Sequence, residues 1–106
     1  MLRIAITDLP DGQRWSLQGR LVGDWAAELI ATWKKTHRTG DTRKTIIDLI
    51  EVTSIDRNGE AALAEMMSQG AEFISGDVYA EHLLRKLRSE LEQSRMKEKQ
   101  DDGSNH

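Results

Sequence analysis

The segment Asp56-Arg57-Asn58-Gly59 holds the side chains with the clearest chemical use in this sequence. It follows an apolar run and precedes an alanine-rich helical pattern, so Asp56 and Asn58 suit the cap of a helix N-terminus. Arg57 is not required by a cap, and its planar guanidinium is suited to binding a carboxylate or a phosphate. Two interpretations stay open for this segment: capping alone, or capping combined with contact to a partner.

Patterns typical of catalysis or metal binding are not found in the sequence. It contains no cysteine and no glycine-rich phosphate loop of the P-loop or dinucleotide-binding type. Ser54, Ser68 and Ser75 have no neighbouring signature of an activated nucleophile, and His37 and His82 have no second ligand at a metal-binding spacing. We therefore expect a protein that is not an enzyme and that uses no cofactor or metal.

Local patterns predict the elements that position these residues. Residues 2–8 and 14–19 carry strand formers on either side of a Pro10-Asp11-Gly12 turn, which indicates a hairpin. Residues 44–50 form a nearly continuous apolar run, which predicts a central strand buried on both faces, and residues 71–75 predict a last strand. Apolar residues at helical spacing predict helices between Gly23 and Gly40, from the Gly59 segment to Gly70, and from Val78 through Leu91.

This order, β-β-α-β-α-β-α, predicts an α/β fold with a mixed sheet of about four strands and helices packed on it. Loops that leave the C-terminal ends of parallel strands gather at one edge of the sheet. Asp24 and Asp77 are placed there as caps of the first and third helices, and the apolar stripe of the first helix favours a core position for Trp25, with an interface anchor as the alternative. We call the predicted set the contact edge; it comprises Asp24, Trp25, Asp56, Arg57, Asn58, Gly59 and Asp77.

Length and composition indicate one small domain. Of the 106 residues 38% are apolar, and residues 92–106 contribute only Met96 to that group. We expect a domain over residues 1–91 and a polar extension over residues 92–106 that begins as a helix end and continues as a disordered tail. The net charge of -3 argues against nucleic acid as a partner. Without a long apolar run or an export signal, we expect a cytoplasmic protein with no membrane insertion.

Three stretches, in order, resemble the STAS domain, the family named for sulfate transporters and anti-sigma factor antagonists. They are Leu17-Gln18-Gly19-Arg20-Leu21, Ile47-Asp48-Leu49 and Val52-Thr53-Ser54-Ile55-Asp56-Arg57-Asn58-Gly59. The resemblance covers about residues 2–91. It implies a non-enzymatic protein–protein interaction module in signal transduction and transcription regulation. Anti-sigma factor antagonists of this family dock on a serine kinase that holds a sigma factor.

The sequence departs from this family at the residue that carries its switch. In the family, phosphorylation of a serine in an Asp-Ser-Ser-Gly stretch releases the partner, because the added negative charge disrupts the contact. Asn58 stands in the place of that serine, and Val22 in the place of an aspartate that many members carry beside it. The resemblance therefore implies a module that binds an anti-sigma kinase or a related signalling protein without the usual phosphoserine. Separately, we expect the chain to be a monomer or a weak homodimer.

Two other functions stay open. A STAS subunit seated on the ATPase of a lipid-trafficking ABC transporter would use the same scaffold. A receiver-like domain would use Asp56, at the end of a central strand, as its phosphoacceptor. Such a domain needs an acidic pair after the first strand and a lysine after a fifth strand, whereas here Asp8 stands alone and no fifth strand is evident.

Overall fold

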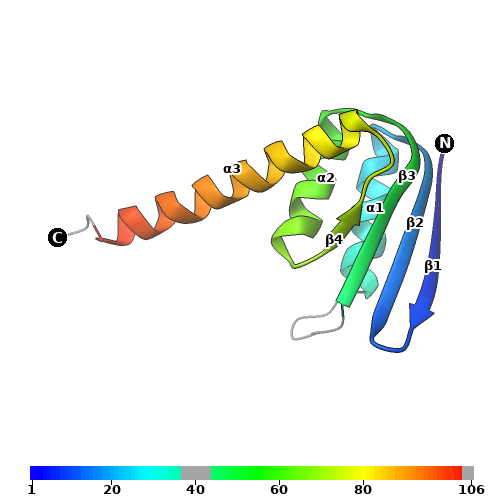
Figure 1. The fold of residues 1–106 in the computed structure, drawn as a ribbon, viewed down its shortest axis with the longest axis horizontal. Helices are drawn as coiled ribbons and strands as arrows, with labels where there is room; N and C mark the ends of the chain where they lie inside the picture. Colours follow the sequence, from blue (N-terminus) through cyan, green and yellow to red (C-terminus); the bar gives the residue numbers. More distant parts are fainter. Residues whose placement is uncertain (37–43, 104–106) are drawn as a thin grey trace.

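The predicted order of elements is confirmed. A computed structural model describes residues 1–36 and 44–103 of the chain (Figure 1). Its elements are β1 (Leu2–Leu9), β2 (Gly12–Leu21), α1 (Asp24–Thr36), β3 (Lys44–Ile55), α2 (Arg57–Ser68), β4 (Glu72–Ile74) and α3 (Val78–Gly103). The fold is α/β, as the sequence predicts, with a four-stranded mixed sheet and three helices.

The strands lie in the sheet in their order along the chain, β1-β2-β3-β4. The hairpin pairs β1 antiparallel to β2 down to Leu9 and Gly12, so Pro10 and Asp11 alone form the turn. β3 runs parallel to β2, and β4 runs parallel to β3. Each crossover adds a strand on the same side, and crossovers of this kind are right-handed, so α1 and α2 lie on the same face of the sheet (Figure 1).

This arrangement corrects the prediction that the central strand is buried on both faces. Along β3, Thr45, Ile47 and Leu49 are buried beneath the helices. Asp48, on the opposite face, is only half-buried, and Ile50 is 53% exposed. The apolar run therefore reflects a strand whose second face carries isoleucines that no helix in residues 1–36 and 44–103 covers.

On the face of the sheet opposite the helices, an ion pair joins β2 to β3. The Arg14 Nη2 atom donates to Asp48 Oδ2 at 2.6 Å, and the backbone N–H of Ile50 donates to Asp48 Oδ1 at 2.9 Å. Burial would raise the pKa of Asp48, but these hydrogen bonds and the charge of Arg14 hold it below its ordinary value. The carboxylate therefore stays ionised in the folded protein.

Two tryptophans form the centre of the core between the sheet and the helices. The rings of Trp15 in β2 and Trp33 in α1 meet edge to face, with centroids 5.5 Å apart and planes at 65°. The indole N–H of Trp33 donates to Gln69 Oε1, just after α2, at 2.8 Å. This contact joins the end of α2 to α1 while keeping the buried indole nitrogen satisfied.

The helix ends agree with the sequence at some positions and differ at others. Gly70 follows α2 with a φ of 96°, as its predicted role at the helix end requires. Asp24 is the first residue of α1, not the residue before it. α3 continues to Gly103, so residues 92–103 of the predicted extension belong to this helix. Residues 37–43 and 104–106, which contain the end of the predicted first helix and of the tail, lie outside the described residues.

Candidate functional site

Asp56 ties together two of the loops that the contact edge requires. It is the N-cap of α2, and its Oδ1 atom accepts the backbone N–H of Gly59 at 2.9 Å. Its other oxygen, Oδ2, accepts the backbone N–H of Gly23 at 3.0 Å, in the loop between β2 and α1. The Gly59 and Gly23 hydrogen bonds, in that order, lower the pKa of Asp56. One carboxylate thus fixes the start of α2 against the start of α1.

Gly59 allows α2 to approach β2 closely. A Cβ atom at this position would lie 2.3 Å from the carbonyl oxygen of Leu21 and 2.9 Å from Ile55 Cγ2. The same Leu21 oxygen accepts the backbone N–H of Asp56 at 3.3 Å. Gly59 itself is buried, so its part in the contact edge is to set the position of the helix rather than to touch a partner.

Arg57 and Asn58 are the outward-facing residues of this segment. Both are exposed, and Arg57 makes no ion pair with any residue in the described ranges. Asn58 lines a shallow groove of about 380 Å³ between α1 and α2, and Asp24 lines the same groove. The floor of the groove is made largely of small side chains, Ala26, Ala27, Ala61 and Ala62. The arrangement leaves room for a partner's side chain beside an amide and a carboxylate.

Trp25 lies apart from that groove. It is 38% exposed, so the prediction of a core position is wrong, and the indole lines a separate hollow with Leu2 and Ile4 of β1 and with Glu28 and Thr32 of α1. The helical turn explains the difference, because Ala26 and Leu29 take the buried side of α1. The structure therefore brings Asp24 and Asn58 together but points Trp25 toward the hairpin.

Asp77 acts as a cap, as predicted, at the start of α3. Its Oδ1 atom accepts the backbone N–H of Ala80 at 2.8 Å. The turn before it packs on β3, where a Cβ on Gly76 would lie 2.9 Å from Ile50 Cα. Two residues after Asp77, the Tyr79 hydroxyl donates to the carbonyl oxygen of Ile55 at 3.4 Å. The first turn of α3 therefore lies along the half of β3 that leads to Asp56.

Sequence reasoning missed several residues that belong to this region. Tyr79 and Val78 are exposed by 57% and 77%, and a helical pattern that follows only the buried leucines gives no sign of them. Glu60 in α2 pairs with Lys86 in α3, with Oε1 and Nζ 3.9 Å apart. Glu65 completes the groove that holds Asn58 and Asp24. The exposure of these side chains and the contacts they make depend on which helices pack against one another.

The hydrogen bonds at Asp56 lie within the fold. Both oxygens of Asp56 accept backbone N–H groups, as a cap requires. Among the side chains described in residues 1–36 and 44–95, no three His, Cys, Asp or Glu residues are grouped as a metal site would need. Within the same ranges no helix has both the length and the apolar composition to cross a membrane. Neither protein-family models nor curated proteins match the chain.

Proposed function

We propose that this chain is a non-enzymatic protein–protein interaction module of the anti-sigma factor antagonist type. The observation that carries the proposal is the double hydrogen bond of Asp56 to Gly59 and Gly23. It holds Arg57 and Asn58 outward on a rigid helix start beside a shallow groove. A surface that is fixed before binding loses little conformational freedom when a partner docks.

The proposed partner is an anti-sigma kinase or a related cytoplasmic signalling protein. Arg57 offers a guanidinium without an ion pair to a described residue, which suits a carboxylate on the partner. Asn58 offers hydrogen bonds but no hydroxyl that a serine kinase could modify. The module therefore binds its partner constitutively, and ATP does not release it.

The charge reversal Arg57→Glu tests the proposed surface. In a binding assay with an anti-sigma kinase encoded beside this chain, we expect at least a tenfold loss of affinity and an unchanged unfolding midpoint, because the residue is exposed. The matched control is Lys35→Glu, an exposed charge in the last turn of α1. Equal affinities of wild type and Arg57→Glu would contradict the proposed surface.

The absence of a switch has its own test. After incubation with the kinase and ATP, mass spectrometry should find no phosphate on residues 54–59, and the complex should persist. Phosphate on Ser54 or any other residue of this segment would overturn constitutive binding. Recovery of an ABC-type ATPase in place of a kinase, when the tagged chain is used as bait, would favour the transporter subunit instead.

A further inference from the structure

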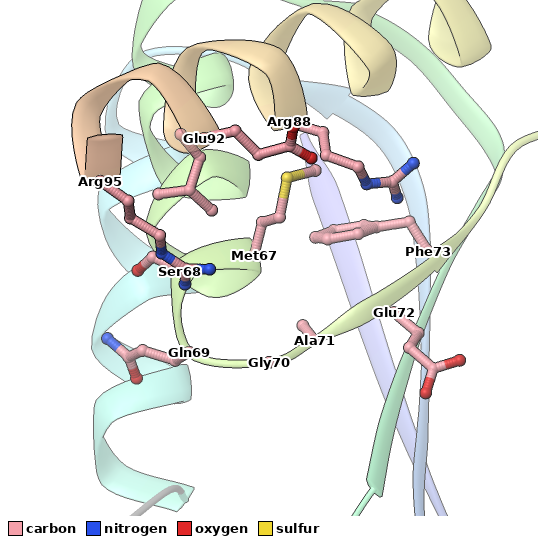
Figure 2. A pocket seen from close by; sticks show the side chains of 11 residues that line it. Met67, Ser68, Gln69, Gly70, Ala71, Glu72, Phe73, Arg88, Glu92 and Arg95 are labelled. Atoms are coloured by element: carbon pink, nitrogen blue, oxygen red, sulfur yellow. The ribbon is translucent and has the colours of Figure 1, made fainter. Parts of the chain in front are cut away.

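A second surface lies beneath α3, on the β4 side of the sheet. α3 passes over the turn that joins α2 to β4 and leaves a groove of about 720 Å³ between them (Figure 2). Apolar side chains from α2, the turn, β4 and α3 line it, namely Met67, Ala71, Phe73 and Leu91. Charged side chains at the groove are Glu72, Arg88, Glu92 and Arg95. We call this surface the α3 groove.

The strand beside the α3 groove has a free edge. β4 pairs with β3 through Glu72, Phe73 and Ile74, and in the described ranges no strand pairs with its other side. The backbone N–H and C=O groups on that side are therefore available to another strand. Three residues supply few hydrogen bonds, so side-chain contacts in the neighbouring groove must provide much of the affinity and the selectivity.

The charges beside this free edge favour an acidic ligand. The Glu72 carboxylate is already paired with Lys44, with Oε2 and Nζ 3.6 Å apart. Arg88 and Arg95 make no ion pair with a described residue, and Glu92 is the only remaining carboxylate among the residues that line the groove. The chain as a whole carries a net charge of -3. With Glu72 paired to Lys44, two arginines and one glutamate are left at the α3 groove, a surplus of one positive charge on an acidic protein.

We propose that the α3 groove binds an extended, acidic segment of a partner protein, which adds to β4 as a fifth strand. Alternate side chains of a strand share one face, so the carboxylates of the segment lie together on the groove side of the added strand, toward the arginines, and the intervening side chains lie on the opposite face of the sheet. Arg88 and Arg95 line the groove together with Phe73 and Ser68 (Figure 2). The two arginines are seven positions apart in α3, which is about 10.5 Å along the helix axis. Two carboxylates of the bound segment that are two to four residues apart along a strand can reach both arginines.

This surface is separate from the contact edge, which lies at the start of α2. A protein that uses both surfaces connects two partners: one bound at Arg57 and Asn58, and one bound along β4. The inference does not rest on the function proposed above, because neither Arg57 nor Asn58 lines the α3 groove.

Two model peptides test the proposal. The probe is an acetylated octapeptide that alternates valine and glutamate, and its matched control alternates valine and lysine. We expect the glutamate peptide to bind at least tenfold more tightly than the lysine peptide, and to shift the NMR amide signals of Glu72, Phe73 and Ile74. Equal binding of the two peptides, no binding of the glutamate peptide, or shifts confined to other strands would overturn the proposal.

Variants of α3 show whether the arginines carry the interaction. The double variant Arg88→Gln/Arg95→Gln should weaken binding of the glutamate peptide at least tenfold, whereas Arg85→Gln, exposed on the same helix, and Arg57→Glu should leave it unchanged. Loss of binding in Arg57→Glu alone would move the peptide to the contact edge and overturn the inference. A concentration-dependent dimer that excludes the peptide and needs Arg88 and Arg95 would assign the groove to a second copy of this chain, which also overturns it.

Discussion

The substitution Gly59→Ala tests the close approach of α2 to β2 on which the contact edge depends. A Cβ atom would lie 2.3 Å from the Leu21 carbonyl oxygen and 3.1 Å from Leu21 Cγ. The oxygen belongs to the backbone of a strand and accepts the Asp56 N–H at 3.3 Å, so it cannot turn aside without weakening that hydrogen bond. The helix must therefore move away from the strand.

The expected cost follows from two opposing effects. Overpacking of a tightly fitted site costs about 1–3 kcal/mol, and replacing glycine by alanine within a helix returns at most about 1 kcal/mol. Because a Cβ atom 2.3 Å from a backbone oxygen puts this site in the upper part of the overpacking range, about 2–3 kcal/mol, the net loss after the gain from alanine is about 1–2 kcal/mol in the free energy of unfolding. For a domain of this size, that loss corresponds to an unfolding midpoint lower by about 4–16 °C.

Thermal unfolding followed by circular dichroism measures this effect. The control is Asn58→Ala, one residue earlier in the same helical turn, where the side chain is exposed and the change should stay within about 0.5 kcal/mol. A Gly59→Ala protein that unfolds at the wild-type temperature or above it would refute the close packing of α2 on Leu21.

Three further outcomes are expected. The folded-state pKa of Asp48 lies below its ordinary value, so the contribution of this carboxylate to stability is complete above about pH 5 and is lost as the pH falls through the folded-state pKa. The unfolding midpoint of Arg14→Ala should therefore depend less on pH between about 5 and 3 than the midpoint of the wild type. An equal dependence would argue against the ion pair. Trp33→Phe removes the hydrogen-bond donor to Gln69 and should lower the free energy of unfolding in urea by about 1–3 kcal/mol. Trp25→Phe should lower it by less than about 0.5 kcal/mol. Similar losses for the two variants would contradict the different burial of the two indoles. Gly70→Ala places a side chain in open space but at a φ of 96°, so backbone strain alone should lower the free energy of unfolding by about 1–2 kcal/mol. Gly70→Asn should lower it by less. An unchanged urea midpoint for Gly70→Ala would contradict the role of backbone strain at this position.

Features that depend on neighbours along the chain could be predicted from the sequence. The caps at Asp56 and Asp77 and the stop at Gly70 are local, since each is decided by a side chain or a backbone angle within a few residues. The hairpin turn and the order of elements follow from the same kind of pattern. These local features also sufficed to place Asp24 near Asn58, because the C-terminal ends of parallel strands meet at one edge.

Features that depend on contacts between distant elements could not be predicted. The second hydrogen bond of Asp56 joins residues 33 positions apart, and nothing at Gly23 indicates an acceptor for its N–H. The exposure of Ile50 depends on which face the helices cover, and an apolar run alone does not encode that choice. The α3 groove depends on the path of one helix over the turn before β4, which the leucine spacing leaves undetermined.

The sequential strand order has a consequence for the route by which the chain folds. No strand is inserted between two that precede it, so the sheet can grow from β1 to β4 in the order of synthesis. The β1–β2 hairpin needs only a two-residue turn to close, and each later strand adds to an edge that already exists. The two parallel pairings close over the longer connections of residues 22–43 and 56–71, so they carry the larger loop-closure entropy and follow the hairpin. A ribosome-bound chain can thus complete most of its sheet before α3 has emerged.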